Sequence, residues 1–156
     1  MTLPSRVGKA LRDQGLKLAL AESLTGGLVA AMVTEVPGSS DYFLLGVAAY
    51  SNRSKVEVLG VSESTLRSHG AVSAECAREM ASGVRRASGA DIGASCTGIA
   101  GPGGATATKP VGLVYLGVDD GRRALVEERR FEGDRSQVRR AAAERLLELI
   151  LLDLEP

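Results

Sequence analysis

The sequence of 156 residues predicts an α/β fold, a three-layer α/β/α sandwich around a mixed β-sheet. Short apolar runs alternate with segments of helical periodicity, which is typical of strand–helix units with parallel strands. Later in the chain, two strand-like runs flank the turn signal Asp119-Asp120-Gly121, which predicts an antiparallel hairpin. Because no repeat or linker interrupts this pattern, we expect residues 1–156 to form a single domain.

The first part of the chain predicts helices and strands in alternation. A first helix has Pro4 in its first turn and ends at Gly15. The elements that follow are a strand over 16–20, a helix over 28–33 and a strand over 44–50. Because the run over 44–50 is continuous and apolar, we expect it to be a central strand, covered on both faces.

The rest of the chain predicts helices with clear start signals and then the hairpin. Two helices have start signals at Ser51-Asn52 and Ser73, and residues 62–66 predict the start of another short helix that ends near Gly70. A strand over 91–96 leads into a Gly-rich loop over 97–110, and the hairpin strands span 111–118 and 124–131. Asp134 caps a last helix, whose apolar face we assign to Val138, Ala142, Leu146, Leu149 and Leu152.

Composition argues against several classes of partner. Formal net charge is zero, which gives no reason to expect nucleic acid or an anionic membrane as a partner. The first residues do not resemble a signal peptide and no apolar run could span a membrane, so we expect a cytoplasmic protein. Cys76 and Cys96 would then be free thiols. The two cysteines and the single histidine lack metal-site spacing, so we expect no metal and no cofactor.

The turn over 21–27 is the first candidate for chemistry. Ser23 lies between a strand and a helix, at the carboxyl edge of the sheet, where ligands bind in open α/β folds. Unpaired N–H groups at the start of the next helix would lie beside Ser23 and could stabilise an oxyanion or an anion. The structural alternative is that Ser23 or Thr25 only caps the helix, while Gly26 and Gly27 allow close packing.

Lys55 is the second candidate, in the first turn of a short helix directly after an apolar strand. Burial and the positive end of the helix dipole would both lower the pKa of a lysine there. A neutral Lys55 could then act as general base for a serine, whereas the structural alternative is a solvated surface lysine.

The Gly-rich loop and two arginines are further candidates, for anion binding. The loop over 97–110 matches neither a Walker motif nor a dinucleotide fingerprint, but its N–H groups could approach a phosphate or carboxylate. Arg135 and Arg139 are four residues apart, share a helix face and could bind a phosphate. A charged surface turn is the alternative for this segment.

Together these motifs resemble a known family, the C-terminal domain of CinA (competence/damage-inducible) proteins, or nicotinamide-nucleotide amidases. The matching motifs, in the family's order, are AESLTGG, YSNRSK followed by VLGV, SHGAVS, TGIAGPGG, KPVG and GDR. The resemblance implies a three-layer fold and frequent homodimers. It also implies hydrolysis of the carboxamide of nicotinamide mononucleotide, which yields nicotinate mononucleotide and ammonia.

The resemblance also implies roles for single residues. Ser23 matches the nucleophile, Lys55 its basic partner and Tyr50 a neighbouring active-site tyrosine. Substrate binding is implied for Thr25, Gly26, Thr97, Gly98, Gly101, Arg135 and Arg139. Glu22 belongs to the first motif, and its role stays open between orienting a catalytic group and contacting the ribose.

Two alternatives stay open from the sequence. Cys96 and His69 could form a cysteine hydrolase if the fold brought them together. The domain could instead bind a nucleotide or a protein without catalysis, in a role linked to competence or DNA damage.

Overall fold

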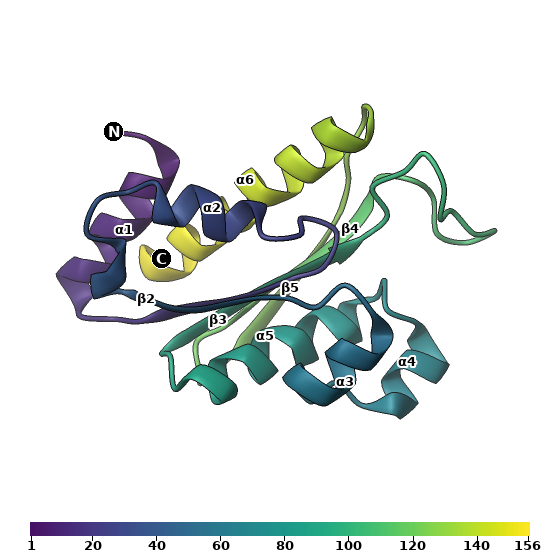
Figure 1. The fold of residues 1–156 in the computed structure, drawn as a ribbon, viewed down its shortest axis with the longest axis horizontal. Coiled ribbons are helices and arrows are strands. Elements are labelled where there is room, and N and C mark those ends of the chain that lie inside the picture. The colour runs from purple at the N-terminus through teal and green to yellow at the C-terminus, as the bar shows by residue number, and fades with distance from the viewer.

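The computed structural model describes residues 1–156 and has a five-stranded sheet between two layers of helices (Figure 1). The elements in chain order are α1 (Leu3–Gln14), β1 (Leu18–Glu22), α2 (Leu28–Thr34), the 3-10 helix η1 (Ser39–Asp41), β2 (Phe43–Ala48), α3 (Asn52–Leu59), α4 (Glu63–His69), α5 (Ala74–Ser88), β3 (Ile92–Gly98), β4 (Leu113–Asp119), β5 (Ala124–Arg130) and α6 (Arg135–Leu154). None of the helices is both long enough and apolar enough to cross a bilayer.

The sheet is mixed, with strand order β2-β1-β3-β4-β5. Strands β2, β1 and β3 are parallel, whereas β4 and β5 form the antiparallel hairpin. Helices α1, α2 and α6 cover one face, and α3, α4 and α5 cover the other (Figure 1). The predicted three-layer α/β/α fold with a mixed sheet is therefore confirmed.

The two layers bury unequal cores. The cluster between the sheet and α1, α2 and α6 holds 24 buried residues, whereas the cluster on the α3 and α5 side holds 9. Lys55 is buried on the side of the smaller cluster, where α3 packs on α5. The smaller cluster is composed mainly of alanine and other small or medium side chains, which brings the helices close to the sheet.

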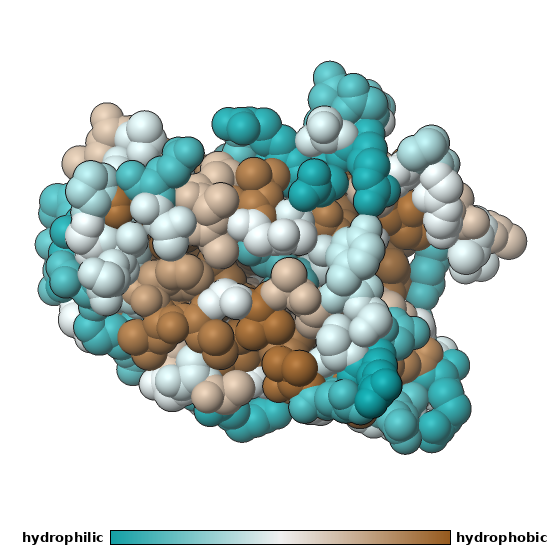
Figure 2. Space-filling model, in the orientation of Figure 1, coloured by the Kyte–Doolittle hydropathy of each residue, from teal (hydrophilic) through white to brown (hydrophobic).

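The prediction of a central strand over 44–50 is wrong, because β2 lies at the edge of the sheet and pairs only with β1. Its residues alternate between half-buried and exposed, and 47% of Leu44 is exposed. Figure 2 shows a hydrophobic band over this strand. A continuous apolar run indicates burial but does not identify what buries it. This open edge is compatible with the predicted homodimer, which stays a prediction.

Two further differences concern element boundaries and faces. Strand β1 begins and ends two residues later than predicted, so Glu22 is its last residue and pairs in register with Ala48 and Cys96. On α6, Leu152 is 57% exposed, whereas Ile150 and Leu151 are buried. Nearly every side of this part of α6 is apolar, so helical periodicity alone could not select the face that packs on the sheet.

Candidate active site

The turn after β1 carries Ser23, and neighbouring segments hold its backbone. The Ser23 N–H donates to the Cys96 carbonyl on β3 at 3.0 Å, and the Gly26 N–H donates to the Ser23 carbonyl at 3.1 Å. Gly26 and Gly27 have φ values of 59° and 107°, which residues with side chains rarely adopt. The turn therefore requires glycine at both positions, and it leaves Ser23 with 9% of its surface exposed.

Lys55 lies directly against Ser23. Its Nζ is 3.0 Å from Ser23 Oγ and 2.9 Å from the Ala49 carbonyl oxygen. Lys55 is 2% exposed and forms no ion pair with a carboxylate. Burial lowers the pKa of Lys55 below its usual value of 10.5, because the charged ammonium is poorly solvated there. A neutral amine so placed can accept the proton of the serine hydroxyl.

Glu22 stabilises the start of α2. Its buried carboxylate accepts hydrogen bonds from the Val29 N–H at 2.9 Å and the Ala30 N–H at 3.0 Å. The prediction that N–H groups at this helix start are unpaired and open to a ligand is therefore wrong. In the turn before α2, the Leu24 N–H has no acceptor within the protein, as is also true of the Gly27 N–H. The Leu24 N–H belongs to the residue directly after Ser23, where an oxyanion donor is useful.

A pocket of about 260 Å³ lies at the carboxyl ends of β1 and β3, beside the Gly-rich loop. The pocket unites most of the predicted site residues, namely Ser23, Tyr50, Lys55, Thr97, Gly98, Gly101 and Arg135. Parallel strands bring their carboxyl ends to one edge of a sheet, and here β1 and β3 do so with their following loops.

Three predicted site residues do not line this pocket. Thr25 is fully buried, with its Oγ1 at 2.9 Å from Cys96 Sγ. Gly26 belongs to the turn itself, and Arg139 hydrogen-bonds to the Leu24 and Thr25 carbonyl oxygens, both at 2.9 Å. These residues lie behind the nucleophile turn rather than in the pocket.

Arg135 links three segments at the pocket. Its guanidinium donates to the Gly101 carbonyl at 2.8 Å and to the Tyr50 hydroxyl at 2.9 Å. Neither Arg135 nor Arg139 forms an ion pair with a carboxylate. This end of the site therefore carries positive charge that no side chain neutralises, which favours an anionic ligand.

The Gly-rich loop projects away from the sheet between β3 and β4 (Figure 1). Its base is fixed, since the Ile99 N–H donates to the Leu113 carbonyl and the Gly112 N–H to the Ile99 carbonyl. The N–H groups of Ala100, Gly101, Gly103 and Gly104 have no protein acceptor. These free donors border the pocket and are available to an anion.

Sequence reasoning missed some pocket residues. Ala71 and Val72 belong to the SHGAVS motif, to which no role was assigned, and Asn52 belongs to YSNRSK. The Thr97 hydroxyl donates to the Ala71 carbonyl at 2.8 Å and so holds this segment at the pocket. The motifs in the sequence could have indicated these residues. The contact between Thr97 and the Ala71 carbonyl could not be predicted from residue spacing, because it involves a main-chain atom from a distant segment.

The structure does not support the pairing of Cys96 with His69. Cys96 is fully buried, and burial raises its pKa to about 12, so the thiol stays protonated and inert. His69 lies on α4, where its Nδ1 is 3.7 Å from the Glu75 carboxylate. Neither residue lines the pocket that contains Ser23.

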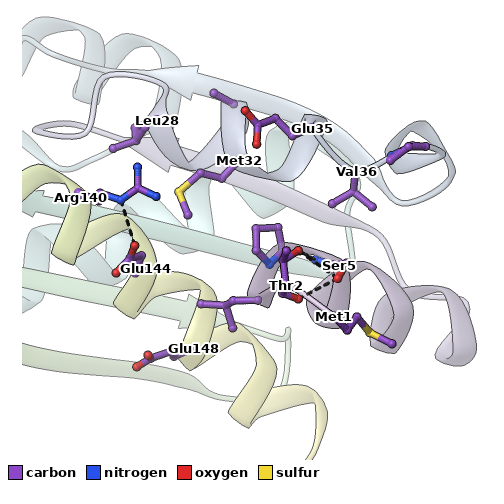
Figure 3. Close-up of a pocket in the computed structure, with 14 residues that line it drawn as sticks. Met1, Thr2, Ser5, Leu28, Met32, Glu35, Val36, Arg140, Glu144 and Glu148 are labelled. Atoms are coloured by element: carbon purple, nitrogen blue, oxygen red, sulfur yellow. Dashed lines mark hydrogen bonds and ion pairs between the residues drawn. The ribbon is translucent and has the colours of Figure 1, made fainter.

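A larger pocket, of about 940 Å³, lies between α1, α2 and α6 (Figure 3). Its walls combine apolar side chains such as Leu28 and Met32 with the carboxylates of Glu35, Glu144 and Glu148. It contains no nucleophile paired with a base. Its three carboxylates outnumber its single lining arginine, Arg140, which disfavours an anionic substrate. The smaller pocket at Ser23 is therefore the candidate active site.

Comparisons with known proteins agree with the fold and the motifs. The matching family model is the CinA C-terminal domain, over residues 1–154. The chain is 50% identical over 149 residues to a CinA-like protein of Syntrophomonas wolfei, covering 96% of this chain and 36% of that protein. It is 53% identical over 137 residues to one from a Geobacter species, covering 88% of this chain and 33% of that protein. The chain thus spans about a third of the length of these curated relatives.

Solved structures match nearly the whole chain. A CinA superfamily protein of Klebsiella pneumoniae has a TM-score of 0.95 and 33% identity, covering 98% of this chain and 96% of that one. The competence/damage inducible protein of Agrobacterium tumefaciens has a TM-score of 0.94 and 40% identity, covering 99% of this chain and 94% of that one. The chain belongs to the CinA C-terminal domain family.

Proposed function

We propose that this chain is an amidohydrolase that uses Ser23 and Lys55 to convert nicotinamide mononucleotide to nicotinate mononucleotide and ammonia. The observation that carries the proposal is the 3.0 Å contact between Lys55 Nζ and Ser23 Oγ, in a buried setting without a carboxylate. A lysine whose neutral form is favoured is the partner that a serine nucleophile needs.

The proposed reaction has two steps. Ser23 Oγ attacks the carboxamide carbon while neutral Lys55 takes the hydroxyl proton, and the carbonyl oxygen becomes an oxyanion near the Leu24 N–H. Lys55 then gives that proton to the departing nitrogen, so ammonia leaves and an acyl ester remains on Ser23. Water attacks this ester while Lys55 takes one of its protons and passes that proton to Ser23 Oγ. The product leaves as the carboxylic acid and loses its remaining proton to solvent, which gives the carboxylate.

The charges around the pocket favour the nucleotide over smaller amides. Arg135 lines the pocket and has no carboxylate partner, and the N–H groups of the Gly-rich loop are free nearby. Binding a phosphate at this end would position the carboxamide at Ser23. Nicotinamide and its riboside lack that phosphate, so we expect both to be far poorer substrates.

The deciding experiment is to incubate the purified protein with nicotinamide mononucleotide and quantify ammonia and nicotinate mononucleotide together. Equal amounts of the two products, absent with the Ser23→Ala protein, would support the proposal. Binding of nicotinamide mononucleotide without turnover would instead favour a non-catalytic nucleotide-binding domain. Equal catalytic efficiency on free nicotinamide would contradict the proposed phosphate recognition.

A further inference from the structure

Two arginines one helical turn apart on α6 contact different parts of the site. Arg135 is exposed and reaches the pocket, where it contacts Gly101 and Tyr50. Arg139 is half-buried, and its Nε and Nη2 each donate at 2.9 Å, to the Leu24 and Thr25 carbonyl oxygens respectively. Spacing on α6 predicts that both arginines serve the ligand, but only Arg135 lines the pocket.

The carbonyls that Arg139 holds have few other partners. The Leu24 carbonyl accepts no backbone hydrogen bond, and Leu24 is 4% exposed, so Arg139 is its only donor within the protein. The Thr25 carbonyl also accepts the Leu28 N–H at 3.0 Å. A buried carbonyl without a donor is unfavourable, and therefore loss of Arg139 would let this turn rearrange.

The guanidinium also packs closely over the turn. A Cβ at Gly26 would lie 3.5 Å from Arg139 Nη2, an ordinary contact distance, so the guanidinium lies directly against this part of the turn. On its other sides the turn is held by the Glu22 carboxylate at the start of α2 and by the Ser23 N–H bond to Cys96. Arg139 is the contact that comes from α6, more than a hundred residues away in sequence.

We propose that Arg139 is a positioning residue, which orients Ser23 Oγ and the free Leu24 N–H by holding the two carbonyls that follow Ser23. This inference rests on the proposed function and assigns Arg139 a role other than phosphate binding. The planar guanidinium suits two neighbouring carbonyls because it donates from two N–H groups in a fixed geometry. A lysine at this position could not reproduce that pair of bonds.

The kinetic test compares Arg139→Ala and Arg139→Lys with Arg140→Ala. Arg140 is the next residue on α6, is exposed and pairs only with Glu144, so its variant is a matched control. We expect kcat to fall about 100-fold in both Arg139 variants, the cost of an ångström-scale misplacement, with KM for nicotinamide mononucleotide unchanged. Methylguanidinium added to Arg139→Ala should restore part of kcat. A raised KM with kcat intact would overturn the proposal, since that result indicates ligand contact.

A second measurement is independent of amidase activity. Hydrogen–deuterium exchange of a peptide covering residues 23–28 reports how firmly the turn is held. Exchange should accelerate in Arg139→Ala and stay at the wild-type rate in Arg140→Ala. Unchanged exchange in Arg139→Ala would overturn the proposal even if the wild-type protein had no amidase activity. Absent activity together with accelerated exchange would contradict only the proposed function.

Discussion

Two backbone segments border the candidate active site and differ in how they are held. The turn over 23–27 is buried at residues 23–25 and is fixed by Glu22, by the Cys96 carbonyl and by Arg139. The loop over 102–108 is exposed throughout, and within it the Thr106 N–H bond to the Lys109 carbonyl is the only main-chain bond donated. The first segment presents a nucleophile, whereas the second presents free N–H groups.

This difference separates chemistry from recognition. A nucleophile and its oxyanion donor must keep their geometry within a fraction of an ångström, which requires buried and fully paired neighbours. A loop that contacts an anion through several N–H groups tolerates more freedom, because each contact contributes only part of the binding free energy. We therefore expect changes in the turn to alter kcat, and changes at the loop to alter KM.

The largest expected effect is at the centre of the turn. Ser23→Ala removes the nucleophile, so kcat should fall by at least about 10⁴-fold. The binding of nicotinamide mononucleotide, measured by calorimetry, should persist because the loop is unchanged. Substantial turnover by this variant would remove Ser23 from the mechanism and contradict the division between the two segments.

The second largest effect is expected at Lys55, where Lys55→Arg should lower kcat by about 10²–10⁴-fold. Arginine keeps the positive charge but cannot be deprotonated in a protein, so it cannot accept the serine proton. In the wild type, the neutral form of Lys55 accumulates as pH rises through the lowered Lys55 pKa. We therefore expect kcat to increase with pH, with a midpoint below pH 10.5. A rate that falls with pH over this window, or an active Lys55→Arg protein, would exclude Lys55 as the base.

Arg135 tests the recognition side. Arg135→Ala should raise KM for nicotinamide mononucleotide roughly 10-fold, the value of a hydrogen bond to a charged group, while kcat changes little. The riboside, which lacks the phosphate, is the control substrate, and its KM should not change. A similar loss for both substrates would mean that Arg135 acts only by holding Tyr50 and Gly101.

The smallest effect is expected within the exposed loop. An added Cβ at Gly103 meets nothing within 4 Å, so Gly103→Ala should change KM by less than about 2-fold, within the range of surface substitutions. Gly98, at the end of β3, is the contrasting position, because a Cβ there would lie 2.6 Å from the Leu113 carbonyl oxygen. Gly98→Ala should lower the melting temperature and kcat together, as thermal unfolding and initial-rate assays would measure. Equal changes in melting temperature and kcat for the two variants would contradict the distinction between the packed backbone at Gly98 and the exposed loop at Gly103.

Much of the fold was predictable because its signals are local. Apolar runs, N-cap serines and the Asp119-Asp120-Gly121 turn identified the elements, and the strand–turn–helix pattern placed Ser23 at an edge of the sheet. The position of Lys55 in the first turn of a helix after a strand also followed from the sequence, including the direction of its pKa shift. These features depend on residues a few positions apart, whose spacing determines the local conformation.

The contacts that complete the site were decided by the tertiary structure. Lys55 meets Ser23 across 32 positions because β2 pairs beside β1, and that strand order follows from packing across the whole sheet rather than from periodicity. The same holds for Glu22, whose carboxylate turned out to stabilise the start of α2, and for Arg139, whose long side chain reaches the nucleophile turn. Spacing places a side chain on a helix face, but only the packed neighbours determine what a flexible arginine contacts.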